Sequence, residues 1–150
     1  MFSGYWYAIA DGDPRGRALY QRHYSARHYR DGRKPALFVG PGEKMVLLTT
    51  DGRALFVWRK FIDASGQTGV NCAVFRNESD VLSSTLILEA EQLAWVRWPG
   101  ERLYTYVNPR AVKSANPGYC YKRAGWRTCG MTKGGLVILE KLPCAPYSSP

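Results

Sequence analysis

The stretch KMVLLTTDGRALFVWRKF, residues 44–61, decides the fold of the first half of this chain. Two apolar, strand-like runs flank Asp51-Gly52, a dipeptide that accepts the positive φ angles of a type I′ turn. Such runs on either side of this dipeptide are typical of a β-hairpin. The stretch therefore predicts two paired strands inside an antiparallel meander.

Further elements are expected before this hairpin. Asp13 as N-cap and Pro14 at the first helical position predict a short helix over 14–23, poorly packed because Gly16 interrupts it. The residues ALFVG predict a short strand that begins at position 36. The N-terminal Trp-Tyr pair at positions 6 and 7 is expected on a strand of the sheet, with base stacking as the alternative.

The second half of the chain alternates strands with helices. The expected elements are a strand at about 69–76, a long helix over 81–98, a strand at 102–107, a short helix at 116–126, and strands near 126–131 and 136–141. Ser79 or Asp80 is expected to cap the long helix, and Gly125 to close the short one. Alternation implies a mixed sheet of the α/β (α+β) class with at least one parallel crossover. We expect one domain over 1–150, with a loose tail at 142–150.

The chain is strongly basic, with a formal net charge of +9. Basic residues cluster within twenty positions and tyrosines interleave them; the cluster comprises Arg15, Arg17, Arg22, Arg27, Arg30, Arg33 and Lys34. Arginine suits bidentate phosphate contacts, and aromatic rings suit base stacking. Within this cluster only Asp31 opposes the charge. DNA is therefore the expected partner, and a solvated basic face is the alternative.

The expected cellular location follows from two kinds of segment that the sequence does not contain. The first residues have no basic start followed by an apolar run, so we expect no signal peptide. No run approaches eighteen apolar residues, so we expect no membrane partner and a cytoplasmic protein. The four cysteines show no metal or disulfide spacing and are expected to be buried and reduced.

The segment YVNPRAVKSANPGYCYKRAGWRTCG, residues 106–130, together with the order of elements over 36–141, resembles the GNAT acyltransferase fold. In that family a strand leads to an Asn- or Pro-rich loop and a short helix that carries a tyrosine and ends in Gly followed by an aromatic residue. Here these positions match Asn116, Tyr119 or Tyr121, Gly125 and Trp126. The resemblance implies that one tyrosine is the general acid that protonates a departing thiolate.

One segment departs from that family. Before the long helix, GNAT enzymes carry a glycine-rich loop that holds the CoA pyrophosphate on backbone N–H groups. The stretch FRNESDVLSS, residues 75–84, contains no glycine, and Glu78 and Asp80 bring negative charge there. The usual CoA pyrophosphate loop is therefore absent, and the cofactor stays open between an acyl-CoA and iron.

The motif His23-Tyr24-Ser25, with the basic surface and the missing glycine loop, resembles the Mom-like DNA-modification proteins of bacteriophages. That resemblance implies an activity on the N6 amine of adenine that shields DNA from restriction. It implies that His23 and Tyr24 lie in the active site with Ser25, and that His23 is a candidate iron ligand.

The histidines cannot form a metal site by themselves. His23 and His28 are five residues apart, which places them about 140° apart on a helix and on opposite faces of a strand. His23 is therefore expected to transfer a proton or contact substrate, with a packing histidine as the alternative. His28 is expected to contact phosphate or solvent.

The glycine-free stretch supplies further candidates. The residues expected to contact the donor or target base are Arg76, Asn77, Ser79, Ser83 and Ser84, and Glu78 is expected to accept a proton from an exocyclic amine. The alternative is that this stretch only caps the long helix. Asp63 is expected to border the same cleft.

Three functions remain open. The first is a phage-type transferase that modifies an exocyclic amine of a DNA base. The second is an acetyl-CoA-dependent N-acetyltransferase of a small amine, a protein or a modified nucleotide. The third is a nucleic-acid-binding module without catalytic activity.

Overall fold

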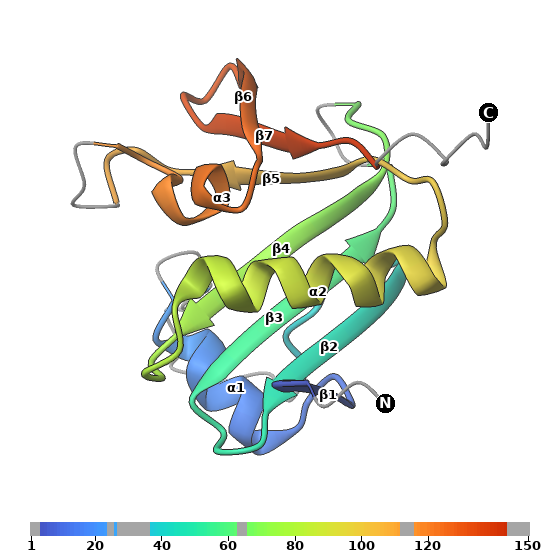
Figure 1. The fold of residues 1–150 in the computed structure, drawn as a ribbon, viewed down its shortest axis with the longest axis vertical. Helices are drawn as coiled ribbons and strands as arrows, with labels where there is room; N and C mark the ends of the chain where they lie inside the picture. Colours follow the sequence, from blue (N-terminus) through green and yellow to red (C-terminus); the bar gives the residue numbers. More distant parts are fainter. Residues whose placement is uncertain (1–3, 24–25, 27–36, 63–65, 112–115, 144–150) are drawn as a thin grey trace, which may run out of the picture.

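The computed structural model describes residues 4–23, 26, 37–62, 66–111 and 116–143, and it has a mixed α+β architecture (Figure 1). Its elements, in chain order, are β1 (Trp6–Ile9), α1 (Pro14–Gln21), β2 (Glu43–Thr49), β3 (Ala54–Lys60), β4 (Val70–Asn77), α2 (Ser83–Arg97), β5 (Leu103–Val107), α3 (Tyr119–Arg123), β6 (Arg127–Met131) and β7 (Val137–Lys141). The fold class expected from the sequence is confirmed at this level.

One sheet contains all seven of these strands, in the order β1-β2-β3-β4-β5-β7-β6. β4 and β5 are parallel, and every other neighbouring pair is antiparallel. A parallel neighbour requires a crossover connection, and α2 provides it. The meander, the crossover and the closing hairpin therefore occur in the expected order.

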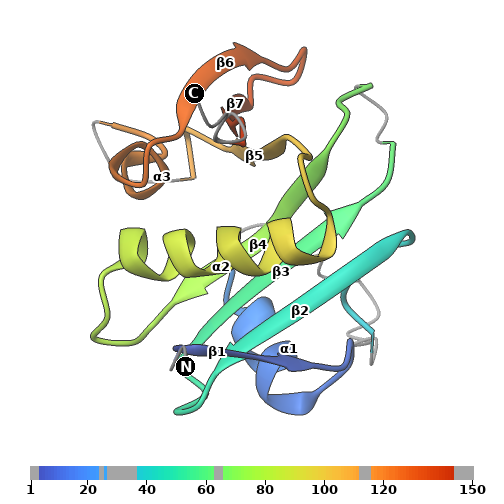
Figure 2. The same ribbon diagram turned by 45° about the vertical axis from the view of Figure 1, so that its right-hand side comes forward.

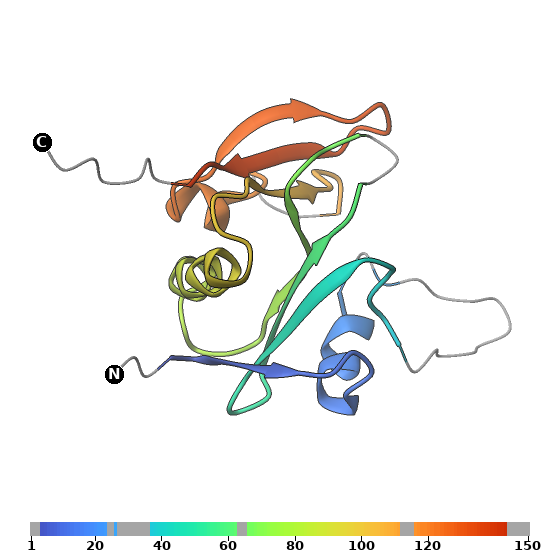
Figure 3. The ribbon, with the colours of Figure 1, turned by 90° about the vertical axis from the view of Figure 1, so that its right-hand side faces the viewer.

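Helices cover both faces of the sheet (Figures 2 and 3). α2 and α3 pack on one face over the larger apolar core, and α1 packs on the other. Indole groups fasten α2 to the sheet, since Trp58 Nε1 donates to the Ala90 carbonyl at 3.0 Å and Trp6 Nε1 to the Leu86 carbonyl at 2.9 Å. Both tryptophans are buried, as expected for strand residues of the core.

The hairpin of residues 44–61 is confirmed, but its turn is not type I′. Gly52 has a positive φ of 71°, whereas Asp51 does not. The amide of Gly52 donates to the Thr49 carbonyl, and the Asp51 carboxylate accepts from Thr49 Oγ1 and the Arg53 amide. The aspartate therefore holds a longer turn with its side chain, and glycine alone takes the left-handed conformation.

The predictions for the N-termini of the helices α1 and α2 differ in outcome. Asp13 caps α1 as expected, but Gly16 does not weaken its packing: a Cβ atom there would lie 2.9 Å from Ile9 Cδ1, so glycine allows α1 to approach the sheet. Neither Ser79 nor Asp80 caps α2. That helix begins later, after Leu82, which is 74% exposed and has no capping side chain.

The strand expected from residue 36 is wrong for residues 37–40, which have no strand structure. Asp11 Oδ1 accepts from the Phe38 and Val39 amides at 2.9 and 3.1 Å, so this segment satisfies its backbone without a neighbouring strand. Position 36 itself and residues 144–150 of the expected tail lie outside the described residues. Among the helices described, none has the length and apolar character needed to cross a bilayer.

Candidate active site

β4 and β5 separate after a short parallel ladder. They pair only from Val70 with Leu103 to Cys72 with Thr105. Immediately beyond, the register of β4 against β3 shifts, which leaves Ala73 as the extra residue of a β-bulge. Past the bulge β4 follows β3 while β5 follows β7, so the two strands diverge (Figure 1).

A cavity of about 530 Å³ lies at this divergence. Its wall is contributed by β4, β5, α3 and the end of α1, and the lining residues are His23, Asn71, Cys72, Ala73, Val74, Phe75, Thr105, Tyr106, Val107, Asn108, Asn116, Gly118, Tyr119, Cys120, Tyr121 and Leu136. Ligand pockets commonly span about 300–1,000 Å³ and combine apolar walls with a few polar groups. The cavity fits that description and is the candidate active site.

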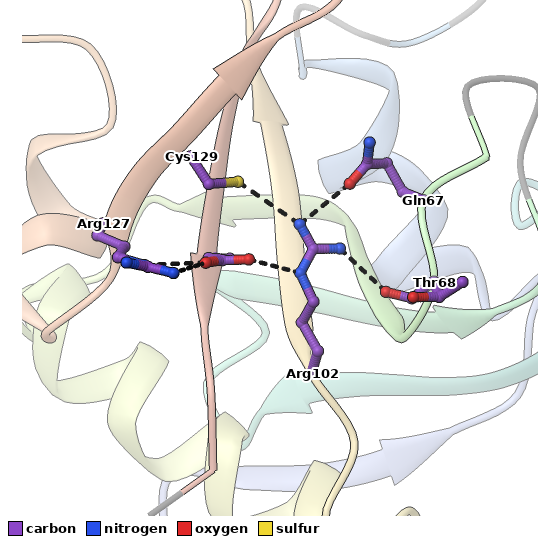
Figure 4. A network of polar contacts seen from close by, with 6 residues as sticks. Gln67, Thr68, Arg102, Arg127 and Cys129 are labelled. Atoms are coloured by element: carbon purple, nitrogen blue, oxygen red, sulfur yellow. Dashed lines mark hydrogen bonds and ion pairs between the residues drawn. The ribbon is translucent and has the colours of Figure 1, made fainter.

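A polar network fastens the strands at the closed end of the divergence (Figure 4). Arg102 donates from Nε to Glu140 at 2.6 Å, from Nη1 to the Thr68 carbonyl and from Nη2 to Gln67 Oε1. Arg127 holds the other oxygen of Glu140, with an Nη2–Oε2 distance of 2.6 Å. The network thus joins β6, β7 and the residue that precedes β5 to the loop before β4, opposite to the open end.

His23 follows α1 and lines the cavity, as the sequence predicts for a site residue. Burial, reinforced by the nearby Arg76 guanidinium, lowers the pKa of His23 to about 4, although a hydrogen bond with the Phe75 backbone opposes this shift. The imidazole is therefore neutral near pH 7 and can accept a proton. Tyr24 and Ser25 lie outside the described residues, as does His28.

Tyr121 lies on α3 with its hydroxyl 3.3 Å from Cys72 Sγ. Burial raises the pKa of Tyr121 well above its usual value, and it raises the pKa of Cys72 to about 12. Both groups keep their protons near neutral pH. Tyr121 can therefore act as a hydrogen-bond or proton donor, whereas Cys72 carries no nucleophilic thiolate.

Tyr119 also lines the cavity, so both tyrosines that match the resemblance contribute to its wall. Tyr119 is 54% exposed and does not belong to the core. Tyr121 occupies the buried wall instead. The structure thus separates an inner tyrosine from an outer one.

Glu78 does not reach the cavity. Its carboxylate accepts from Arg22 Nε and Arg76 Nε, both at 2.7 Å, and from Arg22 Nη2 at 2.9 Å. These hydrogen bonds, with Arg22 the larger cause, lower the pKa of Glu78 to about 2. Because two arginines hold this carboxylate outside the cavity, its position argues against the expected role of Glu78 as a base.

The residues expected to hold a cofactor also lie away from the cavity wall. Asn77 donates from Nδ2 to the Val81 carbonyl and Ser83 Oγ, and its Oδ1 accepts from the amide and hydroxyl of Ser79. These contacts shape the turn before α2. Ser84 lies in the first turn of α2, and like Arg76 it does not line the cavity.

The basic cluster is only partly described. Arg15 pairs with Asp13 at 3.1 Å and Arg22 pairs with Glu78, so Asp31 is not the sole opposing acid. Arg17 lies on α1. The remaining members fall outside the described residues: Arg27, Arg30, Arg33 and Lys34. Asp63, expected to border the cleft, also falls there.

A metal site is not formed by the part of the chain that the structure describes, in which no three His, Cys, Asp or Glu side chains converge. Iron at His23 therefore stays an expectation of the resemblance. Cys72, Cys120 and Cys129 are free thiols, as expected, but of these only Cys72 is buried, since Cys120 is half-buried and Cys129 is exposed. Cys144 lies outside the described ranges.

The most informative residue missed by sequence analysis is Asn71 on β4. It is 7% exposed, lines the cavity and leaves its Oδ1 atom buried without a hydrogen-bond partner. The sequence does contain a signal for this residue, since Asn71 interrupts an otherwise apolar strand sequence, VNCAVF.

Comparison of the chain with protein-family models, with curated proteins and with solved structures finds no match.

Proposed function

We propose that this chain is a group transferase, built on a GNAT-like fold, that modifies an exocyclic amine of a DNA base. The observation that carries the proposal is the cavity between β4 and β5, which has neutral His23 and protonated Tyr121 in its wall. A proton acceptor and a proton donor in one cavity suit the transfer of a group to an amine.

The topology supports the same assignment. The seven-stranded order and the parallel β4–β5 pair agree with the order of elements on which the GNAT resemblance rests. Of the two candidate tyrosines, Tyr121 suits the general acid better because it is buried. The close of α3 at Gly125, with a positive φ of 94°, and the buried Trp126 also agree with that resemblance.

The proposed reaction requires two proton movements. The amine nitrogen attacks an electrophilic carbon of the donor, and the new N–C bond forms as the bond from that carbon to its leaving group breaks. His23 takes the proton that the amine loses. Tyr121 gives its proton to the leaving group. Because His23 has a pKa of about 4, its imidazole is unprotonated at neutral pH.

The DNA part of the proposal rests on charge and on the cavity's outer residue. The net charge of +9 favours a polyanion, and binding through phosphates weakens steeply with salt. A base amine inside a duplex is reached only when the nucleotide is flipped or the strand is single. Tyr119, exposed and part of the cavity lining, offers a ring on which such a base can stack.

A second candidate, an acyl-CoA-dependent N-acyltransferase, is favoured by the start of α2. No side chain caps this helix and no acid occupies its first turn. The two acids that were expected to repel an anion are diverted, since Glu78 is paired with two arginines and Asp80 is exposed beside Arg53. Free N–H groups at a helix start favour a phosphate.

Mass spectrometry of nucleosides from DNA of cells that express the protein tests the first candidate. We expect a new nucleoside that disappears with His23→Ala and with Tyr121→Phe. Calorimetry with acetyl-CoA tests the second. An unchanged nucleoside profile together with acetyl-CoA binding would replace the first candidate by the second.

A further inference from the structure

Asn71 is placed where a polar side chain is costly. It lies in the three-residue ladder between β4 and β5, paired with Tyr104, at the vertex from which the cavity opens. Its Oδ1 atom is buried and accepts no hydrogen bond. Buried polar atoms in folded proteins are almost always paired, so an unpaired one calls for an explanation.

The neighbouring polar groups do not share this property. Thr105, also buried and in the cavity wall, donates from Oγ1 to the Cys72 carbonyl at 2.9 Å. Tyr121 has its contact with Cys72. Among these groups, the unpaired buried atom is therefore specific to Asn71. Asn71 lines the cavity, where a bound ligand would supply hydrogen-bond donors and acceptors.

We propose that Asn71 recognises the edge of the bound base. Its Oδ1 accepts one N–H of the exocyclic amine, and its Nδ2 donates to the adjacent unprotonated ring nitrogen. An asparagine carboxamide makes this bidentate pair with an amine and its neighbouring nitrogen in protein–DNA complexes. This inference rests on the proposed function, and it defines the substrate class as amine-bearing bases, whose edge thymine does not present.

The rest of the cavity suits a flat ring held in this way. Ala73, Val74 and Val107 give apolar walls on both diverging strands, and His23 lines the same cavity as Asn71. With one amine hydrogen on Asn71, the second is left for His23. The carboxamide therefore selects the base and orients the amine, which is a positioning role beside the proton transfer.

Binding of short single-stranded oligonucleotides tests this inference. Homo-oligomers of dA, dC and dT have equal length and backbone charge, so the basic surface contributes equally to each. We expect the wild-type protein to prefer dA and dC over dT by about 5- to 150-fold in Kd, the range for one bidentate pair. Asn71→Leu should reduce this preference to near unity and leave the affinity for dT unchanged.

Thermal unfolding separates recognition from a structural role. Asn71→Leu removes an unsatisfied buried oxygen, so its Tm should equal or exceed that of the wild-type protein. Thr105→Val is the matched control, because it removes a satisfied hydrogen bond in the same wall and should lower the Tm. A folded Asn71→Leu variant that keeps the preference for dA and dC would overturn the inference.

Three further outcomes show whether the role of Asn71 fails alone or together with the proposed function. A wild-type protein that modifies DNA but shows no preference among the oligonucleotides refutes the role of Asn71 alone. If Asn71→Leu weakens acetyl-CoA binding instead, Asn71 contacts the donor and the inference is wrong. Absence of both DNA binding and a new nucleoside removes the proposed function itself.

Discussion

The hydroxyl of Tyr121 lies 3.3 Å from Cys72 Sγ, which joins α3 to β4 across the cavity wall. The contact orients a tyrosine that burial keeps protonated. Burial raises the pKa of Cys72 to about 12 and keeps it a thiol, while the hydrogen bond with Tyr121 acts in the opposite direction. The pair thus places a proton donor on the face of the sheet that α2 and α3 cover.

Tyr121→Phe should abolish most of the proposed transferase activity. The substitution keeps the ring in the core and removes only the hydroxyl, so the loss in kcat should be about 100- to 10,000-fold, the range for general acid–base groups. The free energy of unfolding should fall by only about 0.5–1.5 kcal/mol for the lost hydrogen bond. Quantitative nucleoside mass spectrometry and urea unfolding measure the two effects.

Tyr119→Phe is the control for that experiment. It removes a hydroxyl from the same helix but keeps an exposed ring for stacking. Activity within a few-fold of wild type is expected. If Tyr119→Phe is the more damaging change, the inner tyrosine is not the general acid.

The sequence predicts features of this fold that depend on residues close together in the chain, and it does not predict those that depend on distant residues. The hairpin at residues 44–61 and the helix that carries Tyr121 follow from turn residues and periodicity, which act over a few positions. The cavity does not, because it arises where β4 and β5, far apart in the sequence, stop pairing. Sequence analysis therefore placed the contacts to the donor or target base within residues 75–84, whereas Asn77 uses its amide to shape the turn there.

His23 should make stability depend on pH. Its pKa is lowered from 6.5 to about 4 in the folded protein, so between these values the unfolded chain binds more protons. Stability is therefore greatest above pH 6.5 and falls as the pH drops toward 4. The loss is at most about 3 kcal/mol, at 1.36 kcal/mol per pKa unit.

Urea unfolding at pH 7.5 and pH 5 measures this loss, with His23→Gln as the reference. The glutamine variant cannot titrate, so the difference between the two proteins isolates His23 from the carboxylates. Parallel pH profiles for the two proteins would contradict a buried, neutral imidazole.

Glu78→Gln separates the ion-pair role of Glu78 from the proton-acceptor role that the sequence suggested. The carboxylate bridges Arg22 and Arg76 and its pKa is about 2, so activity should stay within a few-fold of wild type. The stability loss at pH 7 should be about 0.5–1 kcal/mol, because the pairs are partly exposed to solvent. That loss should shrink in 1 M NaCl.

The lowered pKa of Glu78 also predicts how its contribution to stability changes with pH. Because the folded pKa of Glu78 is depressed, its contribution is present above the unfolded value of 4.5 and disappears as the pH falls toward about 2. A large fall in activity for Glu78→Gln at neutral pH, with the fold intact, would instead restore Glu78 as a catalytic base.

Gly69→Ala should open or unfold the closed end of the strand divergence. Gly69 has a φ of 115°, and a Cβ atom there would collide with the Arg102 carbonyl oxygen, which accepts from the Val70 amide at 2.8 Å. Gly66, with a φ of 77° and no atom within 4 Å of its Cβ position, is the matched control. Both substitutions carry backbone strain of about 1–3 kcal/mol, but only Gly69→Ala adds the collision.

Gly69→Ala should therefore lower the free energy of unfolding by clearly more than Gly66→Ala in urea titrations. Because the collision acts on the first residues of the β4–β5 ladder, the cavity should lose its shape before the sheet is lost. Under conditions where the variant is still folded, base preference should fall while salt-dependent DNA binding persists. Equal destabilisation by the two alanines would show that the close approach of Gly69 to Arg102 does not fix the divergence.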